Sequence, residues 1–273
     1  MDRRSPPWVD ISAETPAPSC FCPVEPHRPF LLAADVDGTL LGDDEGEPLL
    51  REFVRGHSNA FRLAVVTGRT LSSVNRLTAQ GRLPRPDYVA SSVGAELVAC
   101  NDPTNALGRE YAARAIEEWD LELIYALGEG AGIRRQEFPD GQPRLRAGFH
   151  WDGAIETLEA FRRRLASQPR CRVLPSARRY IDVLPFGVGK GAVVQFLQRR
   201  LGLAPERVVV AGDSGNDRDM FESGFNGVVP ANALPELREA ACRPWHYHSR
   251  LPAARGVIDG LCHFGFVRVA QRS

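Results

Sequence analysis

The sequence has no long apolar run and no excess of charge of either sign. Nothing in its 273 residues approaches the roughly 18 consecutive apolar residues of a membrane-spanning helix, so no membrane association is expected. No apolar segment of signal-peptide length opens the chain, which favours a cytoplasmic location. Lys plus Arg and Asp plus Glu number 34 each, so the overall charge indicates no nucleic acid or anionic membrane as a partner.

Metal-binding patterns of Cys and His are also lacking. The six cysteines are scattered apart from Cys20 and Cys22, and this pair has no second Cys/His pair at zinc spacing. His246 and His248 alternate as in a strand, but nothing nearby completes a coordination set, so we expect a surface or edge strand there. With 43% apolar and 25% charged residues, the chain can form a packed core.

Proline is concentrated at the start of the chain. Seven of the 21 prolines fall between Pro6 and Pro29, and this stretch shows no apolar period. Such a segment buries too little apolar surface to offset the entropy lost on ordering. We therefore predict that residues 1–28 are a disordered leader, with a docking segment for a partner as the alternative.

Folded structure is expected from residue 30, where buried strand patterns begin to alternate with amphipathic helix patterns. The clearest patterns of both kinds lie at 30–34, 61–66, 70–80, 191–201 and 207–211. This alternation predicts an α/β fold with a Rossmann-like, doubly wound parallel sheet. We assign 29–106 and 186–273 to this core.

The stretch 107–185 differs from the core, because none of the polar motifs described below falls inside it. It holds two amphipathic helix patterns, 109–127 and 153–166, and strand-like residues at 144–151 and 171–183. We therefore predict an inserted α+β cap domain that lies over one edge of the core sheet.

Polar residues gather where the predicted core strands end and where a helix begins. They are Asp35, Asp37, Thr67, Lys190, Asp213, Asn216 and Asp217, with Gly68 following Thr67. In open α/β sheets the carboxyl edge of the strands is where ligands bind. Each short motif can be a simple turn by itself, but together they predict a catalytic or ligand-binding site at this edge.

Four segments resemble the motifs of the haloacid dehalogenase superfamily, whose members are mostly magnesium-dependent phosphatases, namely 35–40, 65–69, 189–191 and 208–217. Further segments are similar to sucrose-phosphate phosphatases, at 86–97, 232–237 and 256–266. The resemblance covers nearly all of 30–266. It implies a Rossmann-like core with a large α/β cap inserted between the second and third motifs.

The resemblance implies hydrolysis of a sugar phosphate through an aspartyl-phosphate. Asp35 would attack phosphorus, and Asp37 would protonate the departing sugar oxygen and then take a proton from the hydrolytic water. Thr67 would donate its hydroxyl and backbone N–H to the phosphoryl group. Lys190 would neutralise a phosphate oxygen and the nucleophile. The residues implied to bind phosphate are Thr67, Gly68, Lys190 and Asn216.

The implied cofactor is Mg²⁺, a hard cation that prefers oxygen ligands. Asp35, the backbone carbonyl of Asp37 and Asp213 would hold the ion. Asp217 would support the shell around it. The metal residues implied by the resemblance are therefore Asp35, Asp37, Asp213 and Asp217.

Residues 142–150 correspond to a cap strand that contacts sugar in sucrose-phosphate phosphatases, but the hydrogen-bond donors differ here. Gln142, Arg146 and His150 fall on one side of this predicted strand, because side chains repeat every two residues. We expect them to face the cleft as partners of sugar hydroxyls, or Arg146 to lie exposed to solvent. The alternate residues should pack against the cap helices, namely Leu145, Ala147 and Phe149.

The expected partner is a small-molecule sugar phosphate, and the expected state is a monomer or weak homodimer. The sugar stays open between a sucrose-6-phosphate-like disaccharide phosphate and a hexose or amino-sugar phosphate. The alternatives are a non-hydrolytic sugar-phosphate-binding or regulatory domain and a phosphotransferase (mutase). Intact Asp35, Asp37, Lys190 and Asp213 favour a hydrolase, and the mixed α+β cap is not typical of mutases.

Overall fold

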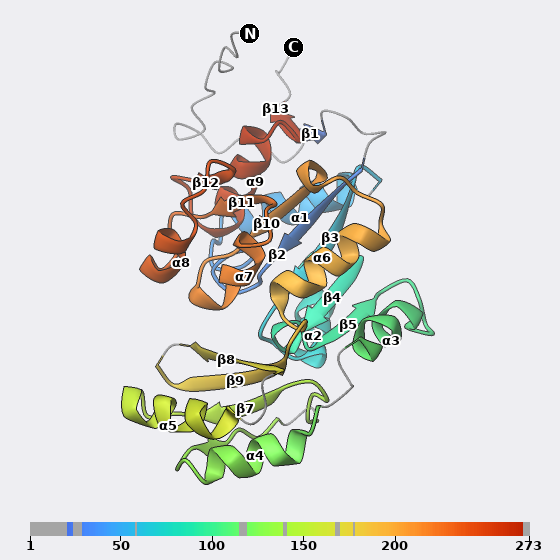
Figure 1. Cartoon of the computed structure of the whole chain (residues 1–273). Coiled ribbons are helices and arrows are strands. Elements are labelled where there is room, and N and C mark those ends of the chain that lie inside the picture. Colours follow the sequence, from blue (N-terminus) through green and yellow to red (C-terminus); the bar gives the residue numbers. More distant parts are fainter. Residues whose placement is uncertain are drawn as a thin grey trace.

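The computed structural model describes residues 21–23, 29–57, 59–114, 119–138, 141–166, 170–176 and 178–269 (Figure 1). Its larger part is a seven-stranded sheet in the order β12-β11-β10-β2-β3-β4-β5. All neighbours are parallel except β4 and β5. The strands are β2 (Phe30–Ala34), β3 (Phe61–Val66), β4 (Tyr88–Ser91), β5 (Glu96–Ala99), β10 (Val208–Ala211), β11 (Asn226–Val229) and β12 (His246–His248). The predicted α/β fold with a mainly parallel sheet is confirmed.

Helices cover both faces of this sheet, which is why its central strand β2 is buried throughout. Leu32 and Ala34 belong to the core on one face, and Leu31 and Ala33 belong to the core on the other. The first face carries α1 (Gly46–Gly56), α2 (Leu71–Ala79) and α9 (Ala253–His263). The second face carries α3 (Ala106–Ala113), α6 (Lys190–Arg200), α7 (Arg218–Phe221) and α8 (Pro235–Ala240).

The order of the strands reverses direction at β2. From β2 the chain moves through β3 to β4 on one side, and after the inserted domain it returns through β10, β11 and β12 on the other side. In open α/β sheets a crevice forms at such a switch point, outside the carboxyl ends of the strands. The ends of β2 and β10 therefore define where a ligand can bind.

A second, four-stranded antiparallel sheet forms the cap, in the order β6-β7-β9-β8. Its strands are β6 (Arg134–Arg135), β7 (Ala147–His150), β8 (Cys171–Ser176) and β9 (Tyr180–Pro185). Helices α4 (Leu121–Glu129) and α5 (Ile155–Leu165) cover the face turned away from the core, so the other face looks toward it (Figure 1). The expected mixed α+β insertion is therefore present.

The boundary of the cap differs from the expected residue 107. Helix α3 packs on the core, where Tyr111 is buried beside Phe196 of α6. The pattern expected to form one helix over 109–127 instead forms α3 and α4, two helices with different partners. Periodicity cannot separate two helices in succession that each present an apolar face.

Strand-like residues 171–183 form the hairpin of β8 and β9 rather than one strand. His246–His248 is an edge strand of the core sheet, as predicted. Within the expected leader, β1 (Phe21–Pro23) pairs with β13 (Val267–Val269). The rest of the leader lies outside the described residues, so its disorder stays a prediction. No helix among the described residues combines the length and apolar character needed to cross a membrane.

We predict that Phe149→Ala destabilises the cap by about 3–5 kcal/mol, the usual cost of removing a buried ring. Phe149 is fully buried between the rings of Tyr125 and Phe161, at centroid distances of 5.2 and 5.1 Å. Urea unfolding followed by tryptophan fluorescence measures this loss of stability, because Trp119 and Trp151 pack against the cap core that contains Phe149.

Ile155→Ala in the same domain is the control for this prediction. The Ile155 side chain is 61% exposed, so its loss should change stability by no more than about 0.5 kcal/mol. Equal urea midpoints for the two variants would contradict the assignment of Phe149 to the cap core.

Candidate active site

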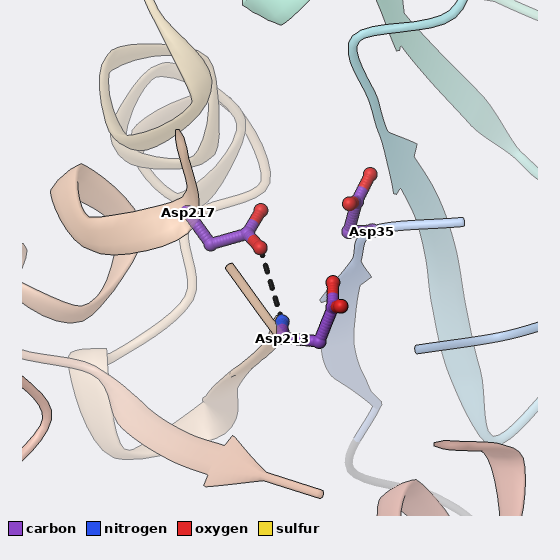
Figure 2. A group of neighbouring side chains, drawn as sticks. All are labelled: Asp35, Asp213 and Asp217. Carbon is purple, nitrogen blue, oxygen red and sulfur yellow. Dashed lines mark hydrogen bonds between the residues drawn. The ribbon is translucent and has the colours of Figure 1, made fainter. Parts of the chain in front are cut away.

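Three carboxylates meet at the switch point of the sheet. Asp35 directly follows β2, and its N–H donates to Ala211 O of β10 at 3.0 Å, so it is held as part of the sheet. Carboxylate oxygens of Asp35, Asp213 and Asp217 all lie within 4.8 Å of one another. Figure 2 shows the three side chains gathered around one space between the strand ends. The structure therefore brings together three of the four residues expected at a metal.

The loop after β10 is shaped by Asp217. Its Oδ2 accepts a hydrogen bond from the backbone N–H of Asp213 at 3.0 Å (Figure 2). It also accepts one from the backbone N–H of Ser214 at 3.0 Å. Gly212 must be glycine here, because an added Cβ would lie 2.6 Å from the Asp217 carboxyl carbon. Asp217, fully buried, thus fixes the position of Asp213 in addition to contributing its own charge.

Lys190 neutralises part of this cluster. It opens α6 and is fully buried, with Nζ 2.6 Å from Asp217 Oδ1, 2.9 Å from Asn216 Oδ1 and 3.1 Å from Asp35 Oδ1. Burial alone lowers the pKa of Lys190, but Asp217 and Asp35 outweigh burial and raise it. The lysine therefore remains a cation beside Asp35, the expected nucleophile. It also donates to Asn216, the expected phosphate ligand.

The negative charge of the cluster exceeds what one lysine balances. Burial raises the pKa of Asp35 to about 6, opposed by Lys190 and reinforced by Asp217. Burial likewise raises the pKa of Asp213 to about 7, with Asp217 and Asp35 adding to it. Three carboxylates that meet within 4.8 Å and have only one buried lysine among them fit a hard divalent cation such as Mg²⁺.

Asp37 lies apart from this cluster and is held by Arg69. Nε and Nη2 of Arg69 donate to the two carboxylate oxygens of Asp37 at 2.7 and 2.6 Å, and Nη1 donates to Ser73 Oγ at 3.0 Å. The Asp37 side chain is 60% exposed, so it remains accessible to a ligand. No role for Arg69 was expected from the sequence, although its position directly after Thr67 and Gly68 at a strand end could have indicated one.

Thr67 differs in one respect from its expected role. Its backbone N–H donates to Ala90 O at 2.9 Å, extending the pairing of β3 with β4, so this N–H is not free for a phosphoryl group. The Thr67 hydroxyl accepts from the Arg69 N–H at 3.2 Å and retains its own proton to donate. The expectation of two donors from Thr67 is therefore wrong for the N–H, and the hydroxyl remains a candidate.

The three cap candidates do not form one row. Strand β7 begins only at Ala147, so the two-residue repeat does not extend back to Gln142 and Arg146. Oε1 of Gln142 accepts from Tyr125 Oη at 2.8 Å, and its Nε2 donates to Arg146 O at 2.6 Å. His150 stands on β7 with its ring 5.5 Å from the ring of Tyr180.

Arg146 is buried rather than solvated. Its exposed fraction is 6%, its Nε donates to Asp182 at 2.7 Å, and its Nη1 donates to Gly68 O of the core at 3.4 Å. The alternative of an exposed Arg146 is wrong. Leu145 also departs from expectation, because it packs at the junction of the two domains with Val93, Leu184 and Val188.

The chain is similar in sequence and fold to known proteins. A family model described as sucrose-6F-phosphate phosphohydrolase matches residues 28–265. The chain belongs to this family. Its membership confirms the predicted haloacid dehalogenase relationship and the assignment as a phosphoric monoester hydrolase.

The relatives of this chain differ in how much of their own length it covers. Mannosylfructose-phosphate phosphatase of Agrobacterium fabrum is 33% identical over 248 residues, which cover 86% of this chain and 96% of that protein. Glucosylglycerol-phosphate synthase of Pseudomonas anguilliseptica is 34% identical over 241 residues, but the chain spans only 31% of its length. The sucrose-phosphatase of Synechocystis, solved with sucrose and phosphate, matches with a TM-score of 0.80 and 29% identity over 88% of this chain and 99% of that one.

We predict that Arg146→Ala lowers the free energy of unfolding by about 3–5 kcal/mol, because it leaves Asp182 buried without a cation. Both side chains of the pair are only 8% exposed. Chemical unfolding measures the loss, with Arg144→Ala, an exposed arginine two residues away, as the matched control.

The double variant Arg146→Met/Asp182→Leu should recover most of this stability, since it removes both charges together. If Arg146→Ala were no less stable than Arg144→Ala, the buried pair would contribute nothing and Arg146 would be available to a ligand.

Proposed function

We propose that this protein hydrolyses a sugar phosphate through an aspartyl-phosphate intermediate, with Mg²⁺ as cofactor. The observation that carries the proposal is the placement of Lys190, buried between Asp35 and Asp217 at the carboxyl end of β2. A lysine held there supports both roles that phosphoryl transfer requires. It keeps the nucleophilic carboxylate anionic, and it neutralises an oxygen of the incoming phosphate.

The first chemical step would use groups already in position. An oxygen of Asp35 attacks phosphorus as the bond from phosphorus to the sugar oxygen breaks, and the Asp37 carboxyl group donates a proton to that oxygen. Water then attacks phosphorus, Asp37 accepts its proton, and the bond to Asp35 breaks to release phosphate. The two hydrogen bonds from Arg69 hold the Asp37 carboxylate in a defined orientation for the second transfer, in which it accepts a proton.

The residues that would hold Mg²⁺ are Asp35, Asp213 and the backbone carbonyl of Asp37, with Asp217 supporting them. Bound there, the ion would supply positive charge against the phosphate and the nucleophile. Phosphate would also contact the Thr67 hydroxyl, Gly68 and Asn216.

Similarity to named enzymes supports the substrate class. The relatives include a mannosylfructose-phosphate phosphatase and a sucrose-phosphatase solved with sucrose and phosphate. We infer that the substrate is the phosphate ester of a glycoside. Sucrose 6-phosphate, mannosylfructose phosphate and glucosylglycerol phosphate are the first candidates, followed by hexose and amino-sugar phosphates. We further propose that the protein acts in the cytoplasm as a monomer or weak homodimer.

We predict that Asp35→Asn lowers turnover by at least about 10³-fold, because the amide keeps the shape of the side chain but is not a nucleophile. Release of inorganic phosphate from the panel of glycoside phosphates, with wild-type protein and Mg²⁺, identifies the substrate on which this loss is measured. Asp44→Asn, which makes the same change at an exposed site, should retain full turnover. Near-wild-type turnover by Asp35→Asn would rule out Asp35 as the nucleophile.

Removal of the metal should abolish turnover reversibly. We expect a chelator to stop phosphate release and added Mg²⁺ to restore it. Titration calorimetry should show that Asp213→Ala weakens Mg²⁺ binding by at least about tenfold, the loss of one charged ligand, while Asp44→Ala binds as wild type. Full activity in chelator, or unchanged Mg²⁺ affinity of Asp213→Ala, would overturn the metal site.

A further inference from the structure

The residue before the buried lysine is a glycine whose side-chain position is occupied by the cap. Gly189 has φ +147°, and an added Cβ would overlap Nη2 of Arg172 and lie 2.7 Å from Asp219 Oδ2. Arg172 belongs to cap strand β8, whereas Gly189 caps the first turn of α6 in the core. A cap side chain therefore stands directly against the peptide that leads into Lys190.

Two polar contacts hold Arg172 in this place. Its Nη2 donates to Val188 O at 2.6 Å and to Asp219 Oδ2 at 3.1 Å. Asp219 lies on α7, and its backbone also packs against Gly191, the residue after Lys190. An added Cβ on Gly191 would lie 2.6 Å from the Asp219 carbonyl carbon. The glycines on either side of Lys190 thus both pack on Asp219, which is paired with the cap.

The core holds the same peptide from the opposite side. Tyr111 Oη donates to Gly94 O at 2.9 Å and accepts from the Gly189 N–H at 3.4 Å. An added Cβ on Gly94 would lie 2.8 Å from the backbone nitrogen of Lys190. The peptide before Lys190 is therefore enclosed between a fixed core contact and an arginine that belongs to the cap.

The Arg172–Asp219 pair is not arranged for greatest stability. Nε of Arg172 and Oδ1 of Asp219 are buried and have no hydrogen-bond partner among the described residues, although a two-bond pairing would satisfy both. Unsatisfied buried polar atoms cost free energy. A contact that leaves two such atoms is better explained by what it positions than by what it stabilises.

We propose that Arg172 is a positioning residue, through which the seating of the cap on the core sets the placement of Lys190. The inference rests on the proposed function, in which the lysine acts on the phosphoryl group. Lys190 contacts three oxygens at 2.6 to 3.1 Å, so a small displacement of its helix end changes all three contacts. The cap therefore affects the phosphoryl chemistry itself as well as the choice of sugar.

The first test compares kcat on two substrates. Arg172→Ala should lower kcat by about 10- to 100-fold on both the glycoside phosphate and p-nitrophenyl phosphate, since misplaced catalytic groups slow the step common to both. Arg162→Ala, a cap arginine paired with Glu159 on its own helix, should leave both values unchanged. A loss confined to KM for the glycoside phosphate would overturn the proposal and make Arg172 a sugar contact. An unchanged kcat on both substrates would overturn it as well.

A double-mutant cycle tests whether the pair acts as one unit. Asp219→Asn and Arg172→Ala should each lower kcat, and the double variant should lose little more than the worse single variant. Additive losses would overturn the proposal. Arg172→Lys, which keeps the charge but not the reach to both acceptors, should regain part of kcat and replaces Arg172→Ala if that variant does not fold.

Hydrogen exchange at the amides of residues 189–191 gives a readout independent of activity. Exchange should be faster in Arg172→Ala than in wild type and unchanged in Arg162→Ala. Equal exchange in all three would overturn the positioning role even in a fully active enzyme. If the wild-type protein released no phosphate from any glycoside phosphate, the proposed function would be overturned instead. The comparison of exchange in wild type and Arg172→Ala would still decide whether Arg172 orders the peptide of residues 189–191.

Discussion

The buried charge of Lys190 is the constraint on which the rest of the site depends. A fully buried ammonium group is stable only with anionic partners at contact distance, and here Asp217 and Asp35 supply them at 2.6 and 3.1 Å. Asp35 comes before the inserted domain in the chain and Asp217 after it. The site therefore exists only when both halves of the core have assembled around the lysine.

The same charges determine what else the site can bind. Three neighbouring carboxylates and one lysine leave the cluster negative, which contributes to the raised pKa values of Asp35 and Asp213. A divalent cation would relieve this repulsion. Close packing of the backbone around the cluster prevents the carboxylates from moving apart. An added Cβ on Gly38 would lie 2.7 Å from the Asp213 carboxyl carbon. The fold holds the cluster compact, so its carboxylates cannot move apart to reduce their repulsion.

Some of this could be predicted from the sequence, because parallel strands impose simple geometry. Asp35 and Asp213 follow buried apolar runs, and neighbouring parallel strands end at the same edge. The expectation that Gln142, Arg146 and His150 form one row on a strand was wrong, for a physical reason. The two-residue repeat holds only inside a strand, and β7 begins at Ala147, after Gln142 and Arg146. Arg69 and Arg172 were missed because long side chains reach partners that the sequence does not place near them.

The sequence by itself determined the alternation of strands and helices, the insertion of a second domain, and the set of polar residues at strand ends. These follow from local periodicity and from the direction of neighbouring strands. The tertiary structure alone decided which charges meet, including Arg69 with Asp37, Arg146 with Asp182 and Arg172 with Asp219. Those pairs join residues 32 to 47 positions apart. Such contacts depend on how a flexible arginine reaches across elements once they have packed, and no pattern of neighbouring residues encodes that.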